Sequence, residues 1–229
     1  MVALLALTAV LALLPQEPPK AAPPAQIEWQ RSLADALAVQ QTTKKPLLLV
    51  LNIDGETFCE QFANRTYRDA AFVATTRGYV CLIASGERHT DSDYDGQGRR
   101  IECPRFGGCT CSEHINNGVL LFQRYFKGES AAPRHYGLAL DGKVLFDRFL
   151  DSSMKTAIEA IAKNGAQDAE PGLPTEAAAL LARRDAAARQ ALEVRYAAGD
   201  AAARKELLAA AAKAPSEPFD LLQIGRAHV

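Results

Sequence analysis

The chain has 229 residues, of which 48% are hydrophobic, and its 26 basic residues nearly balance its 27 acidic ones. This length and composition suffice for one well-buried core and a smaller helical unit, and they argue against a chain that is disordered throughout. The small net charge produces no field that would attract nucleic acid or an anionic membrane surface. We therefore expect no nucleic-acid partner.

The N-terminal segment, residues 1–26, has the composition of a signal peptide followed by a tether. Residues 2–14 are apolar except for Thr8, and residues 15–25 are rich in proline and alanine. The apolar run is too short to span a bilayer and is typical of the hydrophobic region of a secretory signal. No Lys or Arg precedes it and no clean A-x-A cleavage site follows it, so a buried N-terminal strand or helix is the alternative. We expect export to the periplasm or the extracellular space, with no transmembrane span beyond this segment.

The first elements after the tether are expected to alternate between helices and strands. Ser32 is placed to cap a helix that ends before Pro46. Residues 47–53 and 79–84 are almost continuous apolar runs of strand length. Because these runs lack polar alternation, we expect both strands to be covered on both faces, as in an α/β sheet. Two short helices are predicted between the strands, the second of them beginning at Asp69.

The next segment, residues 85–117, is polar, rich in glycine and without periodicity, so we interpret it as an irregular insertion outside the core. Helical spacing resumes in residues 118–126. An Asp-Gly pair then predicts the turn of a hairpin formed by residues 134–140 and 144–149. A last helix is predicted over residues 153–162. The order of elements is therefore helix, strand, helix, strand, helix, hairpin and helix.

This order, with Lys45–Pro46 before the first buried strand and Pro133 before the hairpin, resembles the thioredoxin-like superfamily, in particular its exported thioredoxin_7-like branch. The resemblance covers most of residues 27–164 and implies an α/β thioredoxin-like fold, with a central mixed sheet flanked by helices. It also implies that Pro133 is the family's cis-proline, which faces the active site. Arg134 and His135 follow directly and are expected to line the groove there.

The same resemblance places the family's Cys-x-x-Cys redox pair on Glu56 and Cys59. In a dithiol enzyme the first cysteine lies at a helix N-terminus, which lowers its pKa so that it attacks a disulfide as the thiolate. Here that position holds a carboxylate, which is favourable at a helix N-terminus but forms no mixed disulfide. The catalytic motif positions are therefore Glu56, Cys59 and Pro133, and we expect ordinary dithiol exchange to be absent.

Two functions from different classes remain open. The first is an exported interaction or envelope module without enzymatic activity, which requires protein partners. The second is a thiol-disulfide oxidoreductase of unusual layout, in which Cys59 exchanges with a cysteine of the insertion, namely Cys103, Cys109 or Cys111. The missing attacking thiol at Glu56 favours the first function.

The cysteines of the insertion also suggest structural roles. An exported chain usually pairs such a cluster, so Cys103, Cys109 and Cys111 are disulfide candidates. Together with His114 the three thiols also form a candidate zinc set, which an oxidising compartment makes less favoured than a disulfide. His89 has no partner at a spacing that would predict a metal ligand.

Residues 91–102 match the formal pattern of an EF-hand calcium loop, with glycine at the sixth position. The carboxylates at the first, third, fifth and twelfth positions are Asp91, Asp93, Asp95 and Glu102. A predicted strand and not a helix precedes the loop, and two arginines within it oppose a divalent cation, so a solvated acidic turn is the alternative. We predict no cofactor beyond this calcium candidate.

The composition shifts to Ala, Arg and Glu in residues 165–223, which we expect to be α-helical. Thr175 is placed to cap a long helix that ends near Gly199, and Asp200 is placed to cap another. Paired helices with apolar inner faces resemble the start of a HEAT-like repeat array, and a helical appendage packed on the first domain is the alternative. Residues 224–229 match one reading frame of a common sequencing adapter and are left out of the fold.

Overall fold

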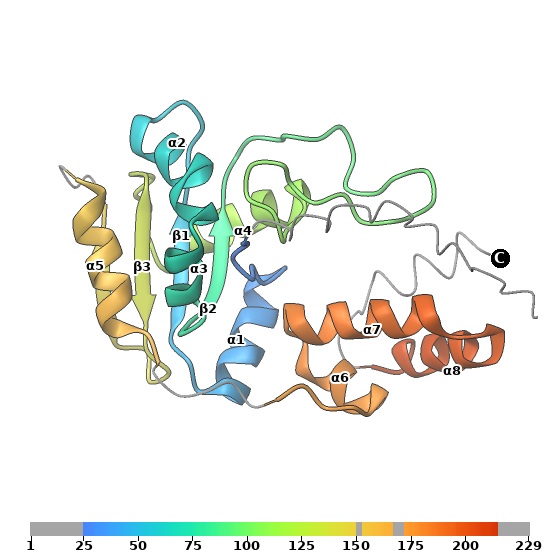
Figure 1. The fold of residues 1–229 in the computed structure, drawn as a ribbon. Coiled ribbons are helices and arrows are strands. Elements are labelled where there is room, and N and C mark those ends of the chain that lie inside the picture. The colour runs from blue at the N-terminus through green and yellow to red at the C-terminus, as the bar shows by residue number, and fades with distance from the viewer. Residues whose placement is uncertain (1–24, 150–152, 167–171, 215–229) are drawn as a thin grey trace, which may run out of the picture.

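The computed structural model describes residues 25–149, 153–166 and 172–214; residues 1–24 of the predicted signal segment and the adapter-like end lie outside the described residues. The centre of the fold is a four-stranded mixed sheet with the strand order β2-β1-β3-β4 (Figure 1). The strands are β1 (Leu47–Leu51), β2 (Val80–Ala84), β3 (Arg134–Leu138) and β4 (Val144–Arg148). Strand β1 is parallel to β2 and antiparallel to β3, and β4 is antiparallel to β3. The chain therefore has the α/β thioredoxin-like fold that the sequence predicted.

Helices cover both faces of the sheet (Figure 1). One face is covered by α2 (Thr57–Asn64), α3 (Ala70–Thr76) and α5 (Met154–Asn164), and the other by α1 (Leu33–Thr43) and α4 (Cys111–Arg124). A 3-10 turn, η1 (Thr66–Arg68), lies between α2 and α3. None of the helices in the described ranges is long and apolar enough to cross a bilayer.

Strand β1 shows why the sequence lacks polar alternation there. Successive side chains of a strand point to opposite faces. Leu48 and Val50 enter the core beneath α2, α3 and α5, whereas Leu47 and Leu49 enter the core beneath α1 and α4. Both faces are thus buried, and the prediction of a doubly covered strand is confirmed.

The predicted helix starts in this part of the chain are also confirmed. The Ser32 hydroxyl accepts a hydrogen bond from the backbone N–H of Asp35 at 3.1 Å, at the start of α1. The Asp69 carboxylate accepts one from the N–H of Phe72 at 2.9 Å, at the start of α3. Each side chain replaces an intrahelical partner that the first turn lacks.

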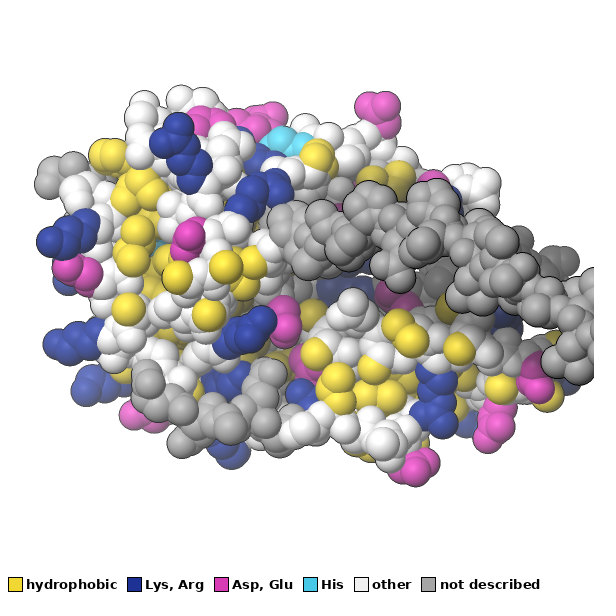
Figure 2. Space-filling model, in the orientation of Figure 1, with side chains coloured by type: hydrophobic (Ala, Val, Ile, Leu, Met, Phe, Trp, Pro, Cys, Tyr) yellow, Lys and Arg dark blue, Asp and Glu magenta, His cyan; other side chains and the backbone are white. Residues whose placement is uncertain are grey.

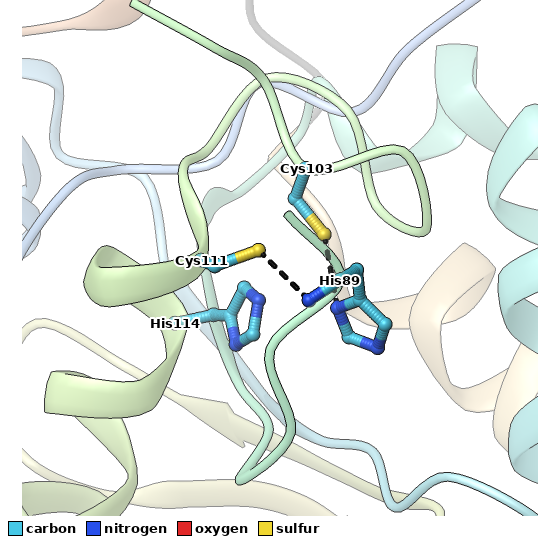
Figure 3. Close-up of side chains that lie close together, drawn as sticks. All are labelled: His89, Cys103, Cys111 and His114. Atoms are coloured by element: carbon cyan, nitrogen blue, oxygen red, sulfur yellow. Dashed lines mark hydrogen bonds between the residues drawn. The ribbon is translucent and has the colours of Figure 1, made fainter. Parts of the chain in front are cut away.

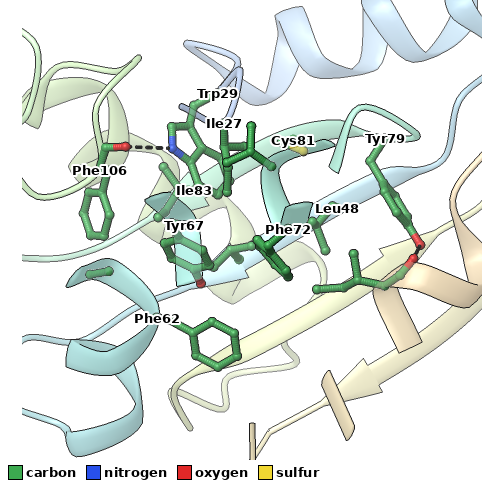
Figure 4. Packing of buried hydrophobic residues seen from close by; sticks show 14 of the residues in the cluster. Ile27, Trp29, Leu48, Phe62, Tyr67, Phe72, Tyr79, Cys81, Ile83 and Phe106 are labelled. Atoms are coloured by element: carbon green, nitrogen blue, oxygen red, sulfur yellow. Dashed lines mark hydrogen bonds between the residues drawn. The ribbon is translucent and has the colours of Figure 1, made fainter. Parts of the chain in front are cut away.

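Trp29, the single tryptophan of the chain, joins the N-terminal segment to the core. Its side chain is fully buried, packs edge-on against Tyr67, and donates a hydrogen bond from Nε1 to the Phe106 carbonyl at 3.4 Å (Figure 4). The backbone beside it bridges to Cys81 of β2. The segment before α1 thus extends the sheet at the β2 edge and is held by residues far along the chain.

The prediction that residues 85–117 form an irregular insertion outside the core is wrong in two respects. Helix α4 begins at Cys111, within this segment, because Thr110 and Glu113 form a capping box. Cys103 and Phe106 are buried in the same core as Trp29. The glycines of the segment hide this packing in the sequence, because they allow tight turns that bring separated apolar residues together.

The C-terminal segment is α-helical, as predicted, but the number of its helices was predicted wrongly. The single helix expected from Thr175 is divided into α6 (Ala177–Arg183) and α7 (Ala186–Ala198). Arg184 adopts a left-handed conformation with φ 61°, and the Asp185 carboxylate accepts a hydrogen bond from the N–H of Ala188 at 2.7 Å. The predicted cap of the last helix, Asp200, does start α8 (Ala201–Ala211). The three helices share a small core of their own, and the HEAT-like array stays a prediction.

The packing of α4 can be tested with two neighbouring leucines. Leu121 is fully buried beneath the sheet, whereas Leu120 is 48% exposed on the same helix. We expect Leu121→Ala to lower the free energy of unfolding by about 2–5 kcal/mol, because it leaves a cavity in the core. Leu120→Ala should change it by less than about 0.5 kcal/mol. Urea unfolding followed by Trp29 fluorescence measures both, and equal effects would show that α4 packs with a different face.

Candidate functional site

The turn after β1 carries the position that resembles the redox site. Asp54 and Gly55 form the turn, with Gly55 at φ 79°, and Glu56 is the N-cap residue of α2. The Glu56 carboxylate accepts a hydrogen bond from the N–H of Cys59 at 2.7 Å. A negative charge in this place is stabilised by the free N–H groups and the dipole of the helix. Glu56 thus caps α2 at the position to which the resemblance assigns the attacking cysteine.

Cys59 lies behind Glu56 and is fully buried. Its sulfur accepts a hydrogen bond from the N–H of Ile53 at 3.2 Å, and its carbonyl accepts one from the side chain of Asn52 at 3.1 Å. Burial raises the pKa of the Cys59 thiol to about 12, and the nearby Glu56 carboxylate raises it as well. The thiol is therefore protonated over the physiological pH range and is a poor nucleophile.

A groove opens between the start of α2, the loop before β3 and the start of α5. We call it the Pro133 groove; the Ala132–Pro133 peptide bond is cis, as the resemblance implied. Its volume is about 200 Å³, and its lining includes Glu56, Phe58, Phe62, Pro133, Phe149 and Met154. Hydrophobic side chains gather between α5 and α2 on the face shown in Figure 2. The groove is thus mostly apolar, with Glu56 and Arg148 as the charged residues of its lining.

The two residues after Pro133 point to opposite faces of the sheet, because successive strand residues alternate. His135 lines the groove, as predicted, and its Nε2 lies 2.9 Å from the Tyr67 hydroxyl. Burial lowers the pKa of His135 to about 3, so the ring is neutral. Arg134 does not line the groove, which corrects the prediction. Its guanidinium donates to Asp147 at 2.8 and 2.7 Å on the other face.

Arg105, which the sequence did not single out, ties the long loop to the start of α2. Its guanidinium donates to Asn52 Oδ1 at 2.9 Å and to Glu60 at 2.9 Å, and it lies 3.3 Å from Asp54. The hydrogen bond from Arg105 is the main reason why the pKa of Glu60 falls to about 2. The one signal in the sequence was Asn52, a single polar residue at the end of an apolar strand.

All five cysteines of the chain are free and buried in the structure. The sulfurs of Cys103 and Cys111 lie within 4.8 Å of each other, in a group that includes neither Cys59 nor Cys109. The disulfides proposed for the loop stay a prediction, and the structure brings Cys103 and Cys111 together.

Of the carboxylates in the calcium-loop pattern, three are engaged by donors of the chain. Asp95 pairs with Arg99 at 2.6 Å, and Glu102 accepts from Gln26 at 3.4 Å. Asp93 accepts from Arg88 at 3.0 Å and from a backbone N–H of α4 at 3.2 Å, whereas Asp91 is exposed. Calcium binding stays a prediction.

The group that the structure does bring together consists of His89, Cys103, Cys111 and His114 (Figure 3). Their potential ligand atoms all lie within 4.8 Å of one another. Three of the four residues were considered as zinc ligands in the sequence. Cys109 is outside the group, and His89, for which no ligand role was predicted, takes its place.

No family model matches the chain, and no curated protein matches it. A solved structure described as DsbH oxidoreductase aligns with 64% of this chain and 94% of its own length, at 16% identity and a TM-score of 0.40. The fold therefore rests on the strand order, the helices and the cis-proline described above.

The reactivity of Cys59 tests the description of the site. Because its pKa is raised from 9.0 to about 12, the thiolate fraction at pH 8 should be roughly a thousandfold lower than for an ordinary thiol. We expect alkylation of Cys59 to be slower by at least that factor in the native chain than in urea, and its rate to keep rising beyond pH 10. Peptide mass mapping at timed intervals measures the rate. Equal rates in the native and the unfolded chain would contradict a buried thiol.

Proposed function

We propose that this chain is an exported thioredoxin-like protein that does not carry out ordinary dithiol exchange and acts as a protein-interaction module. The observation that carries the proposal is the hydrogen bond between Glu56 and the N–H of Cys59. The resemblance assigns the attacking thiol to this capping position, and a carboxylate there forms no mixed disulfide. The remaining thiol is buried and has a raised pKa, so it does not replace the missing one.

The partner segment that fits the Pro133 groove is an extended apolar stretch of another protein. The groove offers apolar surface from Phe58, Phe62 and Met154, and it is large enough for one or two side chains. Non-covalent binding there needs no thiol. Export is supported by the composition of residues 1–26 alone.

The alternative, a thiol-disulfide oxidoreductase that uses Cys59 with a loop cysteine, requires Cys59 to become exposed. Its sulfur is covered, and the group that contains Cys103 and Cys111 does not include it. We therefore favour the interaction module and test the enzymatic function directly.

Reinstating the missing thiol is the sharpest test of activity. We expect the wild-type chain to reduce a small disulfide substrate no faster than the solution reductant does, and Glu56→Cys to gain turnover, because a cysteine at a helix N-terminus has a lowered pKa. Glu56→Ser keeps a capping hydroxyl without a thiol and should stay inactive. The gain should vanish when Cys59→Ser is added to Glu56→Cys. Wild-type turnover that is lost in Cys59→Ser would refute the proposal and support the alternative.

The groove can be tested with a matched pair of phenylalanine variants. Phe58 lines the groove, whereas Phe122 is 38% exposed on α4, on the other face of the sheet. With a labelled, permanently unfolded, cysteine-free polypeptide as the probe, we expect Phe58→Asp to weaken binding by about tenfold or more. Phe122→Asp should leave binding unchanged. Fluorescence anisotropy measures both affinities, and equal losses, or no binding by the wild-type chain, would argue against a role of the groove.

A further inference from the structure

The long loop between β2 and α4 brings four side chains with metal-ligating atoms together. His89 and Cys103 come from the loop, and Cys111 and His114 come from the first turn of α4 (Figure 3). Cys111 and His114 are three positions apart, so they lie on one face of the helix. In the described ranges, no other group of three or more His, Cys, Asp or Glu residues could share a metal ion. Cys103, Cys111 and His114 are buried, and His89 is partly exposed.

Each histidine of this group has one ring nitrogen held by an acceptor and the other turned to the thiols. His89 Nε2 lies 2.8 Å from the Asp54 carboxylate, and its Nδ1 lies 3.3 Å from the sulfur of Cys103. His114 Nδ1 lies 3.1 Å from the Ser85 carbonyl, whereas its Nε2 is buried without any hydrogen-bond partner. A nitrogen next to a carbonyl or carboxylate carries the hydrogen, so the other nitrogen has a free lone pair. Metal-binding histidines are held in this way by an acceptor on the far side of the ring.

The sulfur of Cys111 is held in place by two hydrogen-bond donors. It accepts hydrogen bonds from the N–H of His89 at 3.2 Å and from the hydroxyl of Thr90 at 3.3 Å. The ring of Phe106 packs edge-on against both histidine rings and covers the group with apolar surface. Such a shell restricts the access of water to a metal site.

We propose that His89 Nδ1, Cys103 Sγ, Cys111 Sγ and His114 Nε2 bind one zinc ion with tetrahedral geometry. Two thiolates and two imidazoles form a common structural zinc set, and the two thiolate charges balance the charge of the ion. Ligand atoms around tetrahedral zinc are separated by roughly 3.3–3.8 Å, given its usual bond lengths. The separations of up to 4.8 Å in the group require a contraction of at most about 1.0–1.5 Å. With four protein ligands the site has no open position, so the ion has a structural role.

A disulfide between Cys103 and Cys111 is the competing explanation for the closeness of the two sulfurs. It would leave the lone pair of His114 Nε2 buried without a donor. It would also leave unexplained why both histidines turn a free nitrogen to the same point. Zinc uses all four atoms and is therefore the better explanation.

Zinc at this site would hold the turn between β1 and α2 in place as well as the long loop. Asp54, which holds His89, belongs to the turn between β1 and α2 and is also 3.3 Å from Arg105. The ion would thus connect the loop, the start of α4 and the turn that positions Glu56. Its effect on the Pro133 groove would be indirect, through the position of that turn.

The full chain, purified with a reductant and without added metal, is the sample for the first test. We expect about one zinc ion per chain by elemental mass spectrometry, and, after exchange, a cobalt spectrum with thiolate charge transfer and the intense bands of tetrahedral coordination. His114→Ala and Cys103→Ser should lower cobalt affinity by more than about a hundredfold, and Asp54→Asn by about tenfold to a hundredfold. Cys109→Ala is the matched control, since Cys109 is buried nearby but outside the group, and its spectrum should be unchanged.

The cobalt titration of the unmodified chain decides the question even if a ligand variant fails to fold. Less than about a tenth of an equivalent of zinc, together with no tetrahedral cobalt spectrum in the reduced chain, would overturn the proposal. A loss of the spectrum in Cys109→Ala would overturn the ligand set. A Cys103–Cys111 disulfide, found by thiol trapping and mass mapping in the chain purified without reductant, would overturn it as well.

Discussion

Strand β1 is the constraint on which the rest of the molecule depends. It is an interior strand of the sheet, with β2 on one side and β3 on the other, and apolar cores cover both of its faces. A strand buried in this way has one register and one direction, because a shift by one residue would exchange its two faces. The chain therefore leaves the sheet at a fixed point, and the polar residues that follow, Asn52, Asp54 and Glu56, are fixed with it. Glu56 then contacts the N–H of Cys59, and Asn52 and Asp54 contact Arg105.

The carboxylate at the start of α2 can fill only one of the two roles that a redox cysteine would combine there. A thiolate there benefits from the helix N-terminus and also reacts with disulfides. Glu56 keeps the first benefit through its hydrogen bond to Cys59 and lacks the second. The fold is thus compatible with a cysteine or a glutamate at this position, whereas disulfide exchange requires the cysteine. This is why topology alone says little about activity in such a chain.

Much of the fold could be predicted because the relevant signals are local. The caps at Ser32, Asp69 and Asp200, and the apolar runs of β1 and β2, act within a few residues of themselves. The break at Arg184 was missed because a non-glycine residue in the left-handed conformation leaves little trace in the sequence. The start of α4 was missed because a glycine-rich loop precedes it and Gly118 lies within it.

Within the candidate site, the sequence predicted contacts between residues that are close together along the chain better than contacts between distant ones. Glu56 was expected at a helix N-terminus, and there it accepts a hydrogen bond from the N–H of Cys59, three residues along the chain. His89 was dismissed because it has no ligand at a regular spacing, although it meets Cys103 and Asp54 in space. Arg105 likewise meets Asn52 and Glu60 only after the long loop has folded back. Contacts between residues so far apart depend on the path of the loop, which composition does not specify.

The attachment of the C-terminal helices has a consequence for how the two parts of the chain respond to their surroundings. Helices α6, α7 and α8 have a separate apolar core, and Arg184 and Arg189 reach Asp35 of α1 at 3.8 and 4.0 Å. Ion pairs of this length lose strength as salt screens them, whereas the burial of apolar side chains within each part does not. The docking of the helical unit therefore depends on ionic strength as well as on shape, whereas the apolar cores of the two parts do not.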